Sequence, residues 1–132
     1  MTPVRVLLVD DNAEFLGSAT HFMSEDSDIE IAGYALSGDE ALKQVVRLVP
    51  DLVLMDLAMP GMSGLEATRQ IKALPETPRV VILTLHDNAE YRAAAAAAGA
   101  DGFVAKSEFC TALQPQIHDM FPELACSKGP KT

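Results

Sequence analysis

The sequence VRVLLVDD at residues 4–11 places a mainly apolar run directly before two aspartates. A run without regular polar alternation is typical of a strand that is covered on both faces of its sheet. The pattern recurs in LVLM at residues 52–55 and in VVIL at residues 80–83. The three runs therefore predict the central strands of a parallel sheet.

Two further apolar runs, Ile29 to Ala35 and Gly102 to Ala105, complete a set of five strands that alternates with amphipathic segments. Helical spacing of apolar side chains marks three of these segments: Phe15, Ala19, Phe22 and Met23; Ala41, Leu42, Val45 and Val46; and Leu65, Thr68 and Ile71. Strand–helix alternation predicts an α/β fold with helices on both faces of the sheet. We expect a doubly wound five-stranded parallel sheet in the order 2-1-3-4-5, a flavodoxin-like three-layer sandwich.

Capping boxes, in which a Ser or Thr and an acidic or amide residue three positions later satisfy the first backbone donors, predict where helices begin. They place helix starts at Ser37, Ser63 and Thr111. With Thr111 as the N-cap, Pro115 falls in or just after the first turn, where a missing N–H costs little.

Composition narrows the class of protein. The chain has 132 residues, 48% of them hydrophobic and 22% charged, as expected of one globular domain. Its 19 acidic and 10 basic residues give a net charge of -9, which argues against nucleic-acid binding by this domain. No apolar run approaches the length of a membrane span, so we expect no membrane segment and a cytoplasmic protein. Residues 1–121 form the predicted domain, and residues 122–132 a tail or the start of a linker.

Polar residues stand where the predicted strands end: Asp10, Asp11, Asp56, Thr84 and Lys106. Each alone has a structural explanation as a turn, cap or surface residue. Together they would gather at the carboxyl edge of the sheet, where ligands of such folds bind. Three carboxylates repel one another, and a hard cation such as Mg²⁺ would offset that repulsion. The set predicts phosphoryl chemistry on a carboxylate, and the lack of Cys and His in it argues against zinc.

The sequence resembles the receiver domain of bacterial two-component response regulators from residue 4 to about residue 121. The resemblance is carried by VLLVDD (6–11), PDLVLMD (50–56), MPGMSG (59–64), VILT (81–84) and GADGFVAK (99–106). The last of these is most like receivers that precede a helix-turn-helix output domain.

The resemblance implies that Asp56 is the phosphoacceptor, which takes a phosphoryl group from a phosphohistidine of a sensor histidine kinase. Lys106 would pair with the phosphoryl oxygens, and Thr84 would donate a hydrogen bond to one of them. Phe103 matches the aromatic switch residue of the family. The implied Mg²⁺ ligands are Asp10, Asp11, Asp56 and the backbone carbonyl of Ala58.

Several positions depart from the commonest pattern of the family. Ser107 stands where many receivers have a proline, so the sequence leaves open whether the Lys106–Ser107 peptide is cis. Phe103 lacks the hydroxyl of a tyrosine, and Leu85 is larger than the residue often found after the threonine. Ala58 and His86 occupy positions that tune dephosphorylation in the family, so the phosphoryl lifetime is not predicted.

Two other functions use similar chemistry or the same fold. An aspartyl-nucleophile phosphohydrolase commonly needs a second carboxylate where Ala58 stands. A flavodoxin-type cofactor binder would place a phosphate beside Asp10 and Asp11, which would repel it. We therefore expect a phosphorylation switch rather than an enzyme, with a possible phosphorylation-dependent homodimer formed through residues 87–121. We expect this switch to control transcription through an output domain not present in this chain, and a stand-alone receiver that acts by protein–protein contact is the alternative. The sequence does not identify the kinase, signal, target genes or partner.

Overall fold

The computed structural model describes residues 3–85 and 87–121. Its strands are β1 (Val4–Val9), β2 (Ile29–Ala35), β3 (Leu52–Asp56), β4 (Arg79–Thr84) and β5 (Gly102–Ala105). Its helices are α1 (Ala13–Ser24), α2 (Gly38–Leu48), α3 (Gly64–Lys72), α4 (Ala89–Ala97) and α5 (Phe109–Met120), with a 3-10 turn η1 (Lys106–Glu108) before α5. The predicted tail, residues 122–132, lies outside the described part of the chain.

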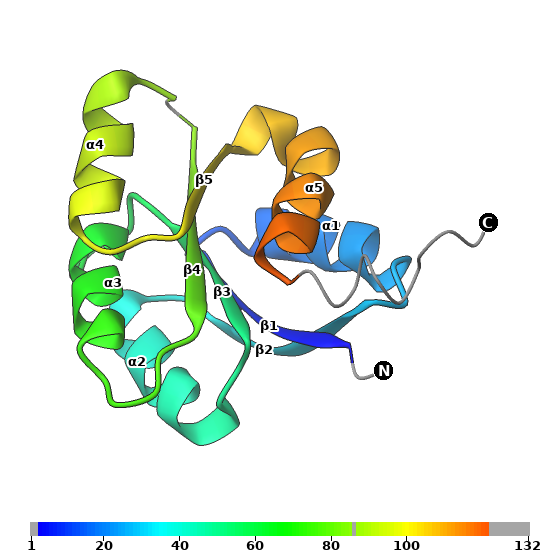
Figure 1. Ribbon diagram of the computed structural model, residues 1–132, viewed down its shortest axis with the longest axis horizontal. Helices are drawn as coiled ribbons and strands as arrows, with labels where there is room; N and C mark the ends of the chain where they lie inside the picture. Colours follow the sequence, from blue (N-terminus) through cyan, green and yellow to red (C-terminus); the bar gives the residue numbers. More distant parts are fainter. Residues whose placement is uncertain (1–2, 86, 122–132) are drawn as a thin grey trace.

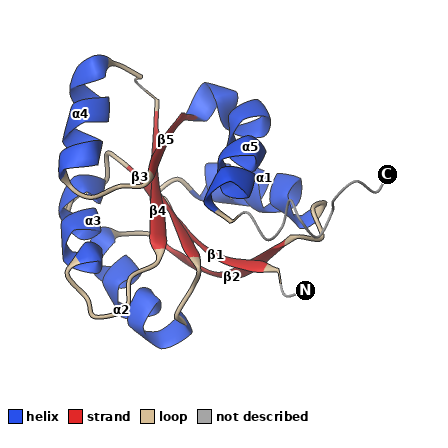
Figure 2. Ribbon diagram, viewed as in Figure 1, coloured by secondary structure: helices blue, strands red, loops and turns tan. Residues whose placement is uncertain are grey.

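All strand pairs are parallel, and the order is β2-β1-β3-β4-β5, which confirms the predicted fold class and strand order. Helices α1 and α5 cover one face of the sheet, and α2, α3 and α4 cover the other (Figures 1 and 2). None of the described helices is long and apolar enough to cross a membrane.

Two hydrophobic cores flank the sheet because successive strand residues point to opposite faces. Val6 and Leu8 of β1 pack in the core beneath α1 and α5. Leu7 and Val9 pack in the core beneath α2, α3 and α4. The central strands are thus buried on both sides, as their uninterrupted apolar runs predicted.

Two of the three predicted helix starts are confirmed. The Ser37 hydroxyl accepts a hydrogen bond from the backbone N–H of Glu40 at 3.1 Å. The Ser63 hydroxyl accepts one from the N–H of Glu66 at 3.2 Å. Each bond satisfies one orphan donor of a first helical turn.

The predicted start of the last helix is wrong. Helix α5 begins at Phe109, and the Thr111 hydroxyl inside it donates to the carbonyl of Glu108 at 3.3 Å. The turn η1 leads the chain directly into α5, and burial of Phe109 in the core anchors the first turn without a side-chain cap. Pro115 consequently lies in the helix interior, on its exposed side.

Gly64, the first residue of α3, allows that helix to begin directly against the end of β3. Its N–H donates to the carbonyl of Leu57 at 3.0 Å. A Cβ at this position would overlap the carbonyl oxygen of Asp56 and approach Leu57 Cα to 3.0 Å. Because both obstacles are backbone atoms, the close approach requires glycine.

We predict that Gly64→Ala lowers the free energy of unfolding by about 3 kcal/mol or more, since the displaced backbone carries Asp56. Gly17→Ala is the matched control, because a Cβ there meets nothing within 4 Å and the position lies in α1. It should raise stability by up to about 1 kcal/mol. Urea unfolding measures both changes, and equal effects of the two substitutions would contradict the packing argument.

Candidate functional site

The carboxyl edge of the sheet brings together the polar residues that follow the strands. Asp10 follows β1, Asp56 and Thr84 end β3 and β4, and Lys106 follows β5. Asp10, Asp56 and Thr84 are buried, whereas Asp11 is exposed. Residues separated by almost a hundred positions in the sequence thus share one site, as their strand-end placement predicted.

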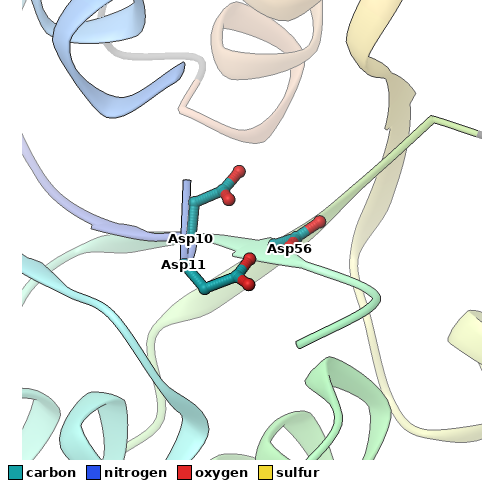
Figure 3. Close-up of side chains that lie close together, drawn as sticks. All are labelled: Asp10, Asp11 and Asp56. Atoms are coloured by element: carbon teal, nitrogen blue, oxygen red, sulfur yellow. The ribbon is translucent and has the colours of Figure 1, made fainter. Parts of the chain in front are cut away.

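The three aspartates form a compact acidic cluster. One carboxylate oxygen of each of Asp10, Asp11 and Asp56 lies within 4.8 Å of the others. Figure 3 shows their side chains next to one another, two from the end of β1 and one from the end of β3. Three carboxylates at this separation repel one another unless a cation lies among them.

Lys106 supplies part of that positive charge. Its ammonium Nζ lies 2.6 Å from Oδ2 of Asp10 and 3.2 Å from Oδ1 of Asp56. The lysine side chain is only 11% exposed. The cluster of three carboxylates and one ammonium still carries an excess of negative charge.

The pKa values of Asp56 and Lys106 reflect this balance. Burial, together with the negative charges of Asp10 and Asp11, raises the pKa of Asp56 to about 6, although the Lys106 ammonium acts in the opposite direction. Burial lowers the pKa of Lys106, but its contacts with Asp10 and Asp56 outweigh burial and raise that pKa above the ordinary value. Asp56 is therefore a carboxylate whose ionised form lacks full compensation.

A cavity of about 250 Å³ opens over the cluster. Its lining consists of Asp10, Asp11, Asn12, Asp56, Leu57, Ala58, Thr84, Leu85, Tyr91 and Lys106. Every residue predicted for phosphoryl transfer and metal binding is in this set. Leu85 and Tyr91 form apolar parts of the wall, and the contribution of Tyr91 from α4 was not predicted from the sequence.

The chemistry of the cavity fits a hard divalent cation. Its charged ligands are carboxylate oxygens, and no cysteine or histidine lines it among residues 3–85 and 87–121. Mg²⁺ prefers such oxygen donors and keeps part of its water shell. His86, which the sequence placed near the site, lies outside the described residues.

A second groove lies between α2 and the loop after α3. It is lined by Val45, Val46, Val49, Leu74, Pro75 and Glu76. With one charged side chain and no converging polar groups, this groove lacks the means for the chemistry that the acidic cavity offers.

Phe103, the predicted switch residue, has its ring in the core beneath α4 and is 9% exposed. The guanidinium carbon of Arg92 lies 4.7 Å from the ring centroid. Two hydrogen bonds, of 2.7 and 3.0 Å, join the Arg92 guanidinium to the carboxylate of Asp87. The ring is thus covered by a side chain that is tied to the loop after Thr84, an arrangement that the sequence did not reveal.

The peptide between Lys106 and Ser107 is trans, as are all the other peptide bonds that the structure describes. This resolves the point that the replacement of a proline by Ser107 had left open.

The fold and the acidic edge define a receiver-type site, and the sequence comparison gives the family. The chain matches the response regulator receiver domain over residues 6–117, and it belongs to that family. It is 39% identical to the response regulator protein VraR of Staphylococcus saprophyticus over 121 residues. These aligned residues are 90% of this chain and 57% of VraR. It is also 39% identical over 109 residues to a protein-glutamate methylesterase/protein-glutamine glutaminase of Koribacter versatilis, covering 81% of this chain and 30% of that protein.

Solved structures give the same picture. The receiver domain of the putative response regulator NarL from Mycobacterium tuberculosis has a TM-score of 0.85 and 28% identity, covering 98% of this chain and 99% of that one. A LuxR-family response regulator from Aurantimonas has a TM-score of 0.86 and 30% identity, covering 92% and 87%. The chain is thus a receiver domain related to LuxR-type regulators. It spans 57% of the length of VraR and 30% of the length of the methylesterase.

The raised pKa of Asp56 predicts a pH-dependent stability. Because the folded-state pKa of about 6 exceeds the ordinary 3.8, ionisation of Asp56 costs stability as the pH rises through this range. Without metal, Asp56→Asn should therefore be more stable than the wild type by about 2 to 3 kcal/mol above pH 7. The difference should shrink below pH 6 and be smallest near pH 4.

Urea unfolding across this pH range, in a metal chelator, measures the effect. Glu76→Gln, which removes an exposed carboxylate far from the cluster, serves as the control and should change stability by less than about 0.5 kcal/mol. A difference between wild type and Asp56→Asn that stays constant from pH 4 to pH 8 would show that Asp56 ionisation carries no cost.

Proposed function

We propose that this receiver domain accepts a phosphoryl group on Asp56 from a sensor histidine kinase. The observation that carries the proposal is the contact of one largely covered lysine with both Asp10 and Asp56 at an acidic cavity. An oxygen of the Asp56 carboxylate attacks the phosphorus of the phosphohistidine. The O–P bond forms as the P–N bond breaks, and the imidazole leaves with the bonding electron pair and takes up a proton.

Each neighbouring side chain has a proposed part in this transfer. Lys106 pairs with a phosphoryl oxygen and balances its charge, which it can do from its position 3.2 Å from Asp56. Thr84, at the end of the adjacent strand, donates its hydroxyl to another phosphoryl oxygen. Ala58 brings no proton-transferring group, so the chain offers a site for phosphoryl acceptance and lacks the acid/base of a phosphohydrolase at that position.

Mg²⁺ would be held by the carboxylates of Asp10, Asp11 and Asp56 and the backbone carbonyl of Ala58. When bound, it would neutralise the charge that the cluster and the incoming phosphoryl group share. The unbalanced negative charge around Asp56 supports this assignment, as does the all-oxygen donor set.

The proposed output is a change of conformation that controls transcription through a domain outside this chain. The similarity to the response regulator VraR and to the LuxR-family response regulator from Aurantimonas supports that output. In this proposal the receiver acts in the cytoplasm as a switch, not as an enzyme with a separate substrate. Residues 87–121 would carry the change, and they would form a homodimer after phosphorylation. A stand-alone receiver that acts by protein contact is the alternative.

Asp56 should be the only site of phosphorylation by a small donor. With Mg²⁺ and acetyl phosphate, the intact mass should increase by one phosphoryl group, which is lost in base as expected of an acyl phosphate. Asp56→Asn should gain nothing. An equal mass gain in both proteins would overturn the assignment of Asp56.

Calorimetric titration with Mg²⁺ should distinguish the proposed metal ligand Asp11 from Lys106, the proposed partner of the phosphoryl group. Asp11→Ala should abolish Mg²⁺ binding because the ion loses a carboxylate ligand. Lys106→Ala should bind Mg²⁺ as well as the wild type or more tightly, since a positive charge is removed. Glu14→Ala, which removes an exposed carboxylate from the same segment, is the control and should bind normally. Loss of binding in Lys106→Ala with retention in Asp11→Ala would reverse the proposed roles.

Phosphorylation should alter hydrogen exchange in residues 87–121. Thr84 precedes this region, and Asp87, Arg92 and Phe103 form a continuous contact chain within it. Beryllofluoride with Mg²⁺, a mimic of the phosphoryl group, should change protection there in the wild type and leave Asp56→Asn unchanged. Changes confined to residues 12–50 would contradict the proposed switch surface.

A further inference from the structure

The ammonium of Lys106 has a third neighbour besides its two carboxylates. Its Nζ lies 4.6 Å from the centroid of the Phe15 ring, over the ring face. Phe15 belongs to the first turn of α1, on a different element from Asp10, Asp56 or Lys106 itself. The lysine head group is therefore bounded by carboxylates and by an aromatic face.

The Phe15 ring is itself fixed in place. Its backbone N–H donates to the side-chain oxygen of Asn12 at 3.1 Å, which caps α1. Its ring meets the ring of Phe109 edge to face, with centroids 5.5 Å apart and planes at 77°. Phe109 is buried and lies three residues after Lys106. The segment that carries the lysine thus also carries the ring that holds Phe15.

An aromatic face suits the task of holding this cation. The negative electrostatic potential over the ring attracts an ammonium, and the attraction is stronger in a site sheltered from water. The position of a lysine ammonium depends on such contacts, because the charge is carried at the end of a flexible four-carbon chain. A ring is also neutral, so its attraction persists when phosphorylation changes the charge at Asp56.

We propose that Phe15 is a positioning residue of the phosphoryl-transfer site, whose ring face holds the Lys106 ammonium directed at Asp56. The consequence for transfer rests on the phosphorylation of Asp56 proposed above, whereas the contact itself does not. In the sequence Phe15 belongs to an apolar helical stripe, which explains packing of the residue but gives no reason for a cation to sit on it.

A simple packing role and a positioning role differ in their response to fluorination. Fluorine atoms withdraw electron density from the ring face and leave the shape of the side chain almost unchanged. Phe22 offers the matched control, because its ring also meets Phe109 edge to face, with centroids 5.8 Å apart. Among the rings of Phe15, Phe22 and Phe109 in the described part of the chain, only that of Phe15 has a cation over its face.

The experiment replaces Phe15 with phenylalanine that carries one, two or three fluorines and measures the rate of Asp56 phosphorylation by acetyl phosphate. The rate should fall in steps, by about threefold to tenfold over the series, with unchanged Mg²⁺ affinity. The same series at Phe22 should leave the rate constant. Equal rates across the Phe15 series, or the same decline at Phe22, would overturn the positioning role.

A second measurement uses neither metal nor phosphoryl donor. With 4-fluorophenylalanine at position 15, the fluorine resonance should move on Lys106→Met, and the terminal methylene protons of Lys106 should be shifted upfield by the ring. With the label at position 22, Lys106→Met should leave the resonance in place. An unshifted Phe15 resonance would overturn the contact. If this arm succeeds and the wild type gains no phosphoryl group, then the proposed function fails and the contact stands.

Discussion

The contact of the Lys106 ammonium with Asp10 and Asp56 is the interaction on which the site depends. Two buried carboxylates would not tolerate each other's charge at this separation without a cation among them. One ammonium balances only part of the charge of three carboxylates, and burial together with the charges of Asp10 and Asp11 keeps the pKa of Asp56 raised to about 6 despite the lysine. The remaining negative charge gives the site its affinity for further positive charge, which is what a metal-assisted phosphoryl acceptor requires.

The topology of the sheet brings Lys106 into contact with Asp10 and Asp56. Parallel strands end at one edge of the sheet, so three segments that are distant in sequence deliver Asp10, Asp56 and Lys106 to the same place. Close packing then sets the distances. Gly64 lets α3 begin against the backbone of Asp56, and the aromatic contact between Phe15 and Phe109 joins α1 to the segment that begins with Lys106. The packing contacts that stabilise the fold therefore also position the residues of the site.

The central strands, their order and the strand-end site residues could be predicted from the sequence, because uninterrupted apolar runs and the residues after them are local signals. The start of α5 could not, since burial of Phe109 outweighed the local capping pattern at Thr111. The Phe15 ring beneath Lys106 and the Arg92 guanidinium over Phe103 were not predicted either. Both depend on how separate elements pack, and neither has a local spacing in the sequence that would reveal it.

A double-mutant cycle on metal-free protein tests the central ion pair most directly. The free energy of unfolding is measured for the wild type, Lys106→Met, Asp10→Asn and the double variant. We expect Lys106→Met to cost about 3 kcal/mol or more, because it leaves buried carboxylates without their cation, and to cost far less in the Asp10→Asn background. A loss of the same size in both backgrounds, or none in either, would contradict the view that this contact holds the site together.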